Sequence, residues 1–522
     1  MLKENSILTS IQKFLKKLWK IKNQFSLRLN RIEFKRIHEI DIIMKINQYY
    51  FLAIFLIGGI FGSTGQHLSS KKKPFNIVLF IADDLAAEDI GPYGNEVVKT
   101  PNLDRLAGES LLFENAFASS PTCAPSRSSI YTGLMPFNHG GHGNHSGVKE
   151  GTKSLPHYLA PLDYRVAIAG KYHVGPEENF PFERILNTNV PEPGFENSPG
   201  LHYDLNMLPV DNWLSEQKQE EPFLLVVADH SPHVIWPEDS QYDPDEIDIP
   251  QRHIDTRETR VSRTRYYQDI TKMDKNVGSL LNSLKKHGME EHTIVVFISD
   301  QGPQWAFGKW SLYDYGIQSP MLVRWPGTIK TNTTTKALVS LVDLLPTFVE
   351  IAGGEGPKNI DGKSFLPLLT GDRDSHREVV FGSHTGDGQM NRSPSRMLRT
   401  ERYKYILNLA PEILYTTHMD RAKDHDGGRE YWDSWREKSF TDAHAKSVLW
   451  RYHHHPKEEL YDVIADPQEF HNLANNPKYY QIKEGFQKQM KTWREEQGDS
   501  ETGPEDLSNK KASKIPGGPY VF

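Results

Sequence analysis

Four short apolar runs stand out along the chain, and each of them ends in ionisable or amide residues. The runs are residues 75–81 before Asp83 and Asp84, 166–170 before Lys171 and His173, 223–228 before His230 and His233, and 293–299 before Asp300 and Gln301. Near-continuous apolar runs of this length are typical of strands that are buried on both faces of a parallel sheet. Because ligands bind at the carboxyl ends of such strands, we expect these polar residues to converge on one site.

Segments with helical periodicity lie between the apolar runs. Residues 264–287 place apolar side chains on one helical face, and residues 103–118 follow the helix-start signal Thr100-Pro101. This alternation of strands and helices predicts an α/β fold with a doubly wound sheet.

The sequence pattern changes after about residue 375. Residues 397–408 predict an antiparallel hairpin that turns near residues 400–402. The segment 409–456 is rich in Trp, Tyr, His and Arg, which suits either sugar stacking or the core of a subdomain. We therefore expect a large α/β domain over residues 66–375 and a smaller subdomain over residues 376–522.

The first residues differ in charge from the rest of the chain. Residues 1–73 contain 14 Lys and Arg against 4 Asp and Glu, whereas the whole chain has a net charge of −7. A basic segment ahead of an acidic body favours a targeting segment over a nucleic-acid surface. Met44 and Lys45 precede an apolar run at residues 51–61 and the small residues 62–65, an order that is typical of a secretory signal peptide.

The sequence therefore predicts a signal peptide over residues 44–65 and a misannotated upstream extension over residues 1–43. The alternative for the extension is a basic amphipathic helix. The apolar run is too short for a membrane span, and no cysteine follows it directly that could carry a lipid. We expect an exported protein, periplasmic or secreted, with no stable membrane anchor and no nucleic-acid partner.

Cys123 is the only cysteine among 522 residues, so it has no partner for an intramolecular disulfide. A lone cysteine usually packs as a small buried hydrophobe. Here it begins the run Cys-Ala-Pro-Ser-Arg at residues 123–127, which closes with Thr132-Gly133. This run resembles the signature of type I sulfatases, in which the cysteine is oxidised after translation to formylglycine (3-oxoalanine). The resemblance implies that a formylglycine-generating enzyme modifies Cys123.

The resemblance covers most of the chain beyond the N-terminal segment. It extends through residues 76–78, 82–84, 100–106, 170–173, 232–233 and 299–302. The stretches 170–176 and 381–383 resemble the heparan N-sulfatase (sulfamidase) branch most, and residues 459–473 resemble the C-terminal module of sulfatases. The resemblance implies an alkaline-phosphatase-like fold with a doubly wound mixed sheet, followed by a smaller C-terminal α+β subdomain with an antiparallel sheet and a helix.

Asp83, Asp84, Asp300 and Gln301 offer oxygen ligands of the kind that Ca²⁺ prefers. The resemblance implies that these four residues surround a Ca²⁺ ion and that the hydrate of residue 123 completes the ligand shell. The family more often has Asn at the position of Gln301, and the longer side chain could shift the ion. Without the family pattern, Asp83 and Asp84 would be interpreted as a solvated turn.

Two basic residues are expected close to the nucleophile. Residues 125–133 predict the start of a helix, which places Arg127 about one turn from residue 123, where it can contact the aldehyde hydrate. Lys309 lies where sulfamidase-like sequences carry a basic sulfate ligand, usually Arg. Outside the family pattern, Arg127 would be interpreted as a surface residue.

Three further residues complete the catalytic set that the resemblance implies. Lys171 binds the sulfate, and His173 holds the nucleophile hydroxyl and later takes its proton. His233 binds sulfate and helps to protonate the leaving group. Lys171 and His173 are two positions apart, so in an extended segment they share one face.

Other histidines are candidates for binding roles. His139, His142 and His145 recur at a spacing of three within a Gly-rich stretch, which suits either a zinc-like cluster or a loop. We interpret this stretch as a pocket wall, with His145 as its best candidate for contact with substrate. His384 could also reach the substrate, whereas residues 453–455 are interpreted as a polar loop without a metal.

These observations predict an exported sulfatase that depends on formylglycine and Ca²⁺ and acts on a sulfated polysaccharide or oligosaccharide. The glycan could be a glycosaminoglycan or an algal polysaccharide such as ulvan. Three alternatives stay open. They are N-sulfate hydrolysis (a sulfamidase), phosphomonoester or phosphonate hydrolysis within the same superfamily, and glycan binding by an inactive sulfatase fold.

Overall fold

The computed structural model describes residues 74–192, 203–218, 220–387, 391–421 and 429–501, besides the isolated positions Lys16 and Lys20. The described residues from Pro74 onward belong to one compact unit, which is the subject below. The expected signal peptide (44–65) and upstream extension (1–43) lie outside the described residues. Among the described helices, none has the length and apolarity that a bilayer crossing requires.

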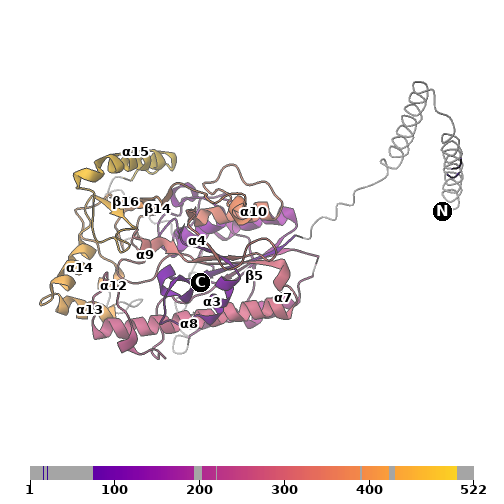
Figure 1. Cartoon of the computed structure of the whole chain (residues 1–522), viewed down its shortest axis with the longest axis horizontal. Helices are drawn as coiled ribbons and strands as arrows, with labels where there is room; N and C mark the ends of the chain where they lie inside the picture. Colours follow the sequence, from indigo (N-terminus) through magenta and orange to yellow (C-terminus); the bar gives the residue numbers. More distant parts are fainter. Residues whose placement is uncertain are drawn as a thin grey trace, which may run out of the picture. The chain divides into compact units, whose positions relative to one another are not determined.

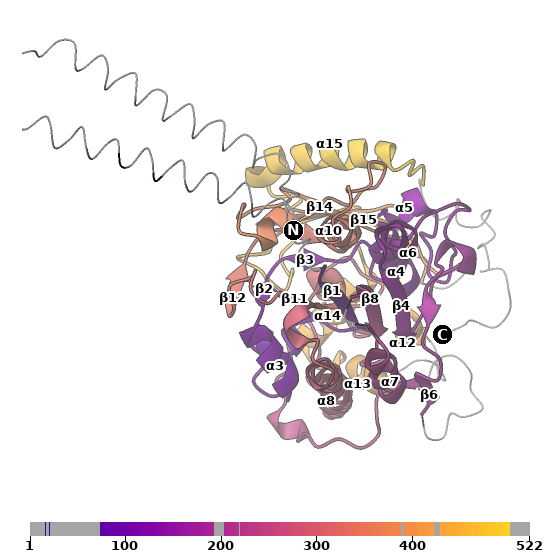
Figure 2. The ribbon, with the colours of Figure 1, turned by 90° about the vertical axis from the view of Figure 1, so that its right-hand side faces the viewer.

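In the described chain, an eight-stranded mixed sheet has the order β12-β2-β11-β9-β1-β8-β4-β5. Figure 2 labels β12, β2, β11, β1, β8 and β4 in this order, and Figure 1 shows the same unit turned by 90°. The strands of this sheet are β1 (Asn76–Ala82), β2 (Leu111–Phe113), β4 (Arg165–Gly170), β5 (Glu183–Arg184), β8 (Phe223–Ala228), β9 (Thr293–Ser299), β11 (Met321–Arg324) and β12 (Thr333–Thr335). The strands from β9 to β5 run parallel, whereas β11 pairs antiparallel with both β9 and β2. All four strands expected from the apolar runs are present and adjacent.

Helices cover both faces of this sheet, because β1, β8 and β9 bury apolar side chains on each face. On one face, Val78 and Phe80 pack in a cluster with α3 (Pro101–Gly108), α7 (Leu208–Ser215) and α8 (Arg257–Lys286). On the other, Ile77 and Leu79 pack in a cluster with α4 (Cys123–Thr132), α6 (Leu155–Leu159) and α10 (Leu344–Ile351). Figure 2 shows the two helix layers on opposite sides of the sheet, as the doubly wound prediction requires.

The prediction of a helix over residues 103–118 is wrong for the second half of this range. The helix begins at Pro101, as the start signal predicts, but it ends at Gly108. The next apolar triplet forms β2, which pairs with β11 and so buries Leu111 and Phe113 in the sheet. In contrast, the helix expected over 264–287 extends further towards the N-terminus, since the Thr256 side chain accepts a hydrogen bond from Thr259 N and caps α8 at Arg257.

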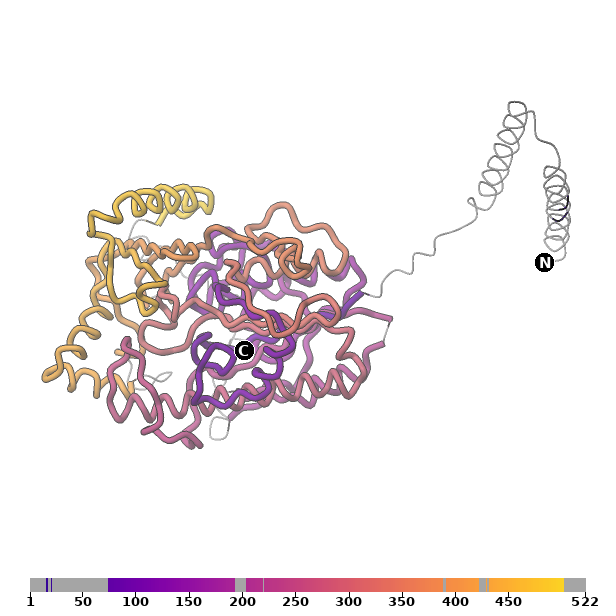
Figure 3. Tube along the Cα trace, in the orientation of Figure 1, coloured from indigo at the N-terminus to yellow at the C-terminus, as the bar shows by residue number. Residues whose placement is uncertain are grey.

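A second, antiparallel sheet has the order β14-β15-β16-β17. It consists of β14 (Val380–His384), β15 (Ser395–Arg399), β16 (Tyr403–Asn408) and β17 (Glu458–Asp462), and the long helix α15 (Tyr480–Glu496) packs on it. The hairpin expected over residues 397–408 is confirmed as β15 and β16. Figure 3 shows this C-terminal part of the chain, in orange to yellow, at one end of the unit.

Shorter elements connect these layers. They are β3 (Ala116–Phe117), β10 (Gln318–Ser319) and β13 (Val339–Ser340) in one small sheet, the hairpin of β6 (Asn189–Pro191) and β7 (Tyr203–Leu205), and the helices α5 (Pro136–His139), α9 (Asp314–Ile317) and α11 (Leu366–Leu369).

The aromatic segment 409–456 forms α12 (His418–Arg421), α13 (Arg429–Lys438) and α14 (Ala443–His453). Tyr431, Trp432, Trp435 and Tyr452 are buried there and belong to the same core cluster as α8. Their packing favours the subdomain-core interpretation over sugar stacking for these four side chains. Trp450 differs, because 65% of its surface is exposed.

Candidate active site

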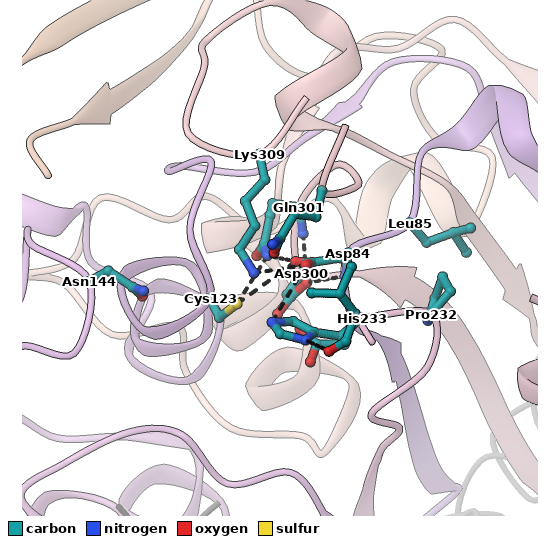
Figure 4. A network of polar contacts seen from close by, with 12 residues as sticks. Asp84, Leu85, Cys123, Asn144, Pro232, His233, Asp300, Gln301 and Lys309 are labelled. Atoms are coloured by element: carbon teal, nitrogen blue, oxygen red, sulfur yellow. Dashed lines mark hydrogen bonds and ion pairs between the residues drawn. The ribbon is translucent and has the colours of Figure 1, made fainter. Parts of the chain in front are cut away.

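The carboxyl ends of four neighbouring strands meet at one edge of the large sheet. β9, β1, β8 and β4 are adjacent and parallel, so the residues that follow them lie side by side. Asp300 N donates to Ala82 O at 3.1 Å, and Lys171 N donates to Ala228 O at 2.8 Å. The convergence that the sequence predicts for the polar residues at these ends is therefore present (Figure 4).

Gly170 allows β4 and β8 to approach each other closely where they enter the site. Its φ is +80°, and a Cβ atom at this position would lie 2.0 Å from Ala228 O. Only glycine fits such an approach without moving the backbone. The next residue, Lys171, is thereby fixed at the edge of the sheet.

Helix α4 brings Cys123 to the same edge. The helix begins at Cys123, two residues before the predicted start, and the whole of it is buried. Ser126 Oγ donates to Asp300 O at 2.5 Å, and Ala124 N donates to Asn144 Oδ1 at 3.3 Å. These contacts fix the first turn of α4 against the end of β9.

Carboxylates and cations alternate around Cys123. Lys171 Nζ donates to Asp83 Oδ2, and Lys309 Nζ donates to Asp84 Oδ2 at 2.7 Å. The Arg127 guanidinium bridges two strand ends, with Nε 2.9 Å from Asp300 Oδ2 and one terminal nitrogen 3.4 Å from Asp83 Oδ1. All of these side chains are almost completely buried, so the charges are poorly screened by solvent.

This cluster shifts the pKa values of its acids in opposite directions. Burial opposes the charged form of Asp83, yet the cations Lys171 and Arg127 outweigh it and hold the pKa of Asp83 well below its usual range. For Asp300, burial dominates and raises its pKa to about 8, although Arg127 opposes the shift. Burial beside two other carboxylates thus disfavours the charged form of Asp300.

The carboxylate and amide oxygens of the cluster are suitable ligands for a hard cation. Among the described residues, the buried Gln301 Oε1 has no hydrogen-bond partner, and Asp83 Oδ1 has none beyond its ion pair with Arg127. Ligand atoms of Asp83, Cys123 and Asp300 lie within 4.8 Å of one another. Carboxylate and amide oxygens are the ligands that Ca²⁺ prefers. Asp83, Asp84, Asp300 and Gln301 could therefore hold that ion.

The Cys123 thiol faces this cluster directly. Gln301 Nε2 donates to Cys123 Sγ at 3.2 Å, and the thiol donates to Asp84 Oδ1 at 3.8 Å (Figure 4). Burial raises the pKa of Cys123 to about 12, in spite of the nearby Lys171 and Lys309. The thiol is therefore neutral at physiological pH and is a weak nucleophile as it stands.

His173 and His233 flank the cluster as neutral imidazoles. His233 Nδ1 donates to Val234 O at 2.6 Å, which turns its Nε2 towards Asp84 Oδ2 at 3.6 Å. Burial lowers the pKa of His233, and burial together with Lys171 lowers that of His173 well below its ordinary value. His173 and Asp84 both have positive φ, at +42° and +66°, a strained conformation that clusters at functional sites.

The remaining histidine candidates differ in their surroundings. His145 lies near the site, since its ring centroid is 5.0 Å from that of His173. His384 is buried beside Trp310, and its Nε2 lies 3.1 Å from Asn391 O, which it can donate to. His139 is buried against Ser129.

Among the described residues, the triads with metal-ligand geometry all include Cys123, so the stretch 139–145 forms no zinc-like cluster. The loop expected over residues 453–455 is wrong for His453, which is the last residue of α14 and donates from Nδ1 to Tyr415 O; His454 and His455 follow the helix.

The sequence did not single out Asn144 or Asp387. Asn144 accepts from the first turn of α4, and Asp387 Oδ2 lies 3.0 Å from His145 Nδ1. The one available signal is position, because Asn144 lies inside the Gly-rich stretch and Asp387 lies three residues past β14.

Comparisons with known proteins agree with this geometry. A profile of the sulfatase family matches residues 75–354, and a profile described as N-sulphoglucosamine sulphohydrolase, C-terminal, matches residues 302–446. An ulvan-active sulfatase of Formosa agariphila is 34% identical over 82% of this chain and 81% of its own length. Human N-sulphoglucosamine sulphohydrolase is 29% identical over 82% of this chain and 91% of its own length.

Solved structures of other proteins have a similar fold. A solved structure described as in complex with its substrate, D-glucosamine-2-N,6-O-disulfate, superimposes with a TM-score of 0.61 at 20% identity and covers 82% of this chain and 99% of the other. Such structures share the alkaline-phosphatase-like fold. Because the family profile spans more than half of the chain and the sequence relatives span most of it, this protein is a sulfatase, a member of the sulfatase family with the C-terminal region typical of N-sulphoglucosamine sulphohydrolases.

Proposed function

We propose that this protein is an exported sulfatase that hydrolyses sulfate esters of a sulfated polysaccharide or oligosaccharide, with formylglycine at residue 123 and Ca²⁺ as its cofactors. One observation carries the proposal. The only cysteine of the chain begins a buried helix and faces three carboxylates and two lysines from the segments that follow β1, β4 and β9. The expected domains, 66–375 for catalysis and 376–522 for the C-terminal subdomain, are part of the same proposal.

Each part of the site has a role in this chemistry. Cys123 Sγ stands where the hydroxyl oxygens of a formylglycine hydrate would lie, and the hydrate supplies a nucleophile that a neutral thiol does not. Ca²⁺, when bound by Asp83, Asp84, Asp300 and Gln301, supplies positive charge for the sulfate oxygens.

The chain's own residues would bind and move protons around these groups. Lys171 and Lys309 are buried cations near residue 123, suited to neutralise sulfate oxygens as charge develops. Arg127 holds Asp83 and Asp300 in place. His173 and His233 are neutral, so each can accept a proton from the nucleophile. The imidazolium formed in this way can then pass the proton to the leaving group.

The relatives support a saccharide substrate. Two of them are named as an ulvan-active sulfatase and as N-sulphoglucosamine sulphohydrolase, and both names indicate a sulfated sugar as the substrate. The second candidate function is hydrolysis of N-sulfated glucosamine, and the C-terminal profile match over residues 302–446 favours it. Export through a signal peptide at 44–65 and maturation by a formylglycine-generating enzyme belong to the proposal as well.

The first experiment is to measure sulfate release by the full chain, co-expressed with a formylglycine-generating enzyme, from a panel of sulfated saccharides. The panel contains N-sulfated glucosamine, O-sulfated glycosaminoglycan fragments and ulvan fragments, and Cys123→Ala is the control. Release from one class, lost in the control, supports the proposal and separates O-sulfate from N-sulfate cleavage.

Two other outcomes would contradict the proposal. Formylglycine confirmed by peptide mass, with phosphate or phosphonate esters cleaved faster than any sulfate, would assign the chain to the phosphohydrolases of the superfamily. Saccharide binding without turnover in the fully matured protein would indicate an inactive glycan-binding member.

A further inference from the structure

Two loops from distant parts of the chain meet beside the nucleophile helix. Asn144 N donates to Gly386 O at 2.9 Å, and His142 Nδ1 lies 3.4 Å from Thr385 Oγ1. The first loop follows α5, and the second follows β14 of the antiparallel sheet. The C-terminal region therefore contributes directly to a wall of the active site.

An imidazole–carboxylate pair lies at this junction. His145 Nδ1 is 3.1 Å from Asp387 Oδ1 and 3.0 Å from Asp387 Oδ2. A carboxylate accepts hydrogen bonds, so it fixes the Nδ1–H tautomer and the orientation of the ring. His145 has a φ of +59°, a left-handed conformation that L residues adopt rarely and that clusters at functional sites.

The pair is open to ligands, unlike the charged cluster around Cys123. The His145 and Asp387 side chains are 27% and 13% exposed, whereas those of Asp83 and Arg127 are fully buried. The His145 ring lies 5.0 Å from the His173 ring, and the preceding residue, Asn144, accepts a hydrogen bond from Ala124 in the first turn of α4. A group bound at residue 123 would thus have this pair next to it.

The charge of the pair decides what it can bind. With a neutral imidazole the pair is anionic, and with a protonated imidazole it is neutral, so in neither state does it offer net positive charge to a sulfate. Hydrogen bonding to an uncharged hydroxyl or amino group has no such penalty. The sulfate itself is instead matched by Lys171 and Lys309, which lie in the buried cluster.

We propose that His145, oriented by Asp387, is a specificity-determining residue that hydrogen-bonds a sugar hydroxyl or amino group next to the scissile sulfate. Asp387 acts through His145 and is a positioning residue. This inference rests on the proposed saccharide sulfatase function, and it assigns part of the substrate selection to the C-terminal region.

The test compares two substrates in fully matured protein. His145→Gln and Asp387→Asn are assayed with the best sulfated saccharide of the panel and with 4-nitrophenyl sulfate, which has no sugar hydroxyls. A lost hydrogen bond to a positioned polar group should lower kcat/KM on the saccharide by roughly 10- to 100-fold. The loss on the aryl sulfate should be at least several-fold smaller, and the double variant should lose little more than either single variant.

His471→Gln is the matched control, because its Nδ1 also lies near an aspartate, Asp466 at 3.4 Å, but its side chain is 82% exposed and far along the chain from this junction. Formylglycine content, measured by peptide mass, must be equal in all variants.

Equal losses of kcat/KM on both substrates, or no loss on either, would overturn the role given to His145 and leave the proposed sulfatase function unaffected. A wild-type enzyme that cleaves only the aryl sulfate would overturn the proposed saccharide function, and this inference with it.

Discussion

Lys309 Nζ lies 2.7 Å from Asp84 Oδ2, although 225 positions separate the two residues in the sequence. Asp84 follows β1 and Lys309 lies in the segment after β9, so the pairing of these two strands brings them together. Burial opposes the charge on Lys309, but Asp84 outweighs it and raises the pKa of Lys309 above its ordinary value. The site thus keeps a fixed positive charge next to residue 123.

Two replacements of Lys309 should show whether its positive charge or its particular side chain is needed for activity. Loss of one donor aimed at developing charge typically costs 10²- to 10³-fold in rate, so Lys309→Ala should lower kcat for sulfate release by about that factor. Lys309→Arg should keep much of the activity, since a guanidinium also places a permanent positive charge at this position. Steady-state kinetics on one saccharide checks both. Lys491→Ala, with a side chain that is 79% exposed, is the control, and a fully active Lys309→Ala would contradict the role given to Lys309.

Asp300 should be required for the metal. Its carboxylate contacts Arg127 and accepts from Asp84 N at 3.2 Å, so Asp300→Ala removes a ligand from the centre of the cluster. We expect loss of bound calcium, measured by elemental analysis of purified protein, together with loss of activity. Asp245→Ala, at a side chain that is 81% exposed, should leave both unchanged. Normal calcium content in Asp300→Ala would refute the proposed ligand set.

Arg396 should be important for stability rather than for chemistry. Its buried guanidinium lies 2.7 and 2.9 Å from the Asp499 carboxylate oxygens and 2.7 Å from Glu501 Oε2. Removing one partner from a buried ion pair leaves uncompensated charge and costs about 3–5 kcal/mol, so Arg396→Met should lower the free energy of unfolding by that amount. Denaturant unfolding measures it. Arg402→Met, whose ion pair with Asp462 is at the surface, should have little effect, and similar losses in both variants would argue against this account.

His139 should make stability depend on pH. Burial lowers its pKa to about 3 from an ordinary value of 6.5, so the unfolded chain takes up a proton below that value while the folded chain does not. The stability that the neutral ring contributes is complete above pH 6.5 and is lost as the pH falls towards 3. By about pH 5 the loss amounts to about 2 kcal/mol.

The comparison variant for this prediction is His139→Gln. The difference in the free energy of unfolding between wild type and this variant should shrink by about 2 kcal/mol between neutral pH and about pH 5. His471→Gln, at an exposed position, should show no comparable change. A constant difference for His139→Gln across this range would mean that the residue is not held neutral in the fold.

Much of the site was predictable because its residues follow strands. The apolar runs before Asp83, Lys171, His233 and Asp300 mark buried parallel strands, and the rule for such sheets places their carboxyl ends at one edge. The order of the strands could not be read from the runs alone, since β9 pairs with β1 across more than 200 residues. The family resemblance suggested the roles proposed for Lys309 and His233, which periodicity does not reveal.

The rest depended on contacts that leave no local pattern. The second half of the helix expected at 103–118 became β2 because a tertiary partner, β11, buries Leu111 and Phe113. Asp387 reaches His145 from 242 positions away, and no spacing rule connects the two. The aromatic residues of 409–456 were ambiguous in composition, and only their packing against α8 decides between core and surface for Trp432 and Trp435.

Gly170 has a consequence for how substitutions in this enzyme should be interpreted. It has no side chain, yet any Cβ there would collide with the carbonyl of Ala228 and displace Lys171. A survey of random variants would therefore score this position as sharply as the nucleophile itself. Positions at the edge of the sheet that tolerate no substitution would then include the point where two strands approach most closely, as well as the groups that perform the reaction.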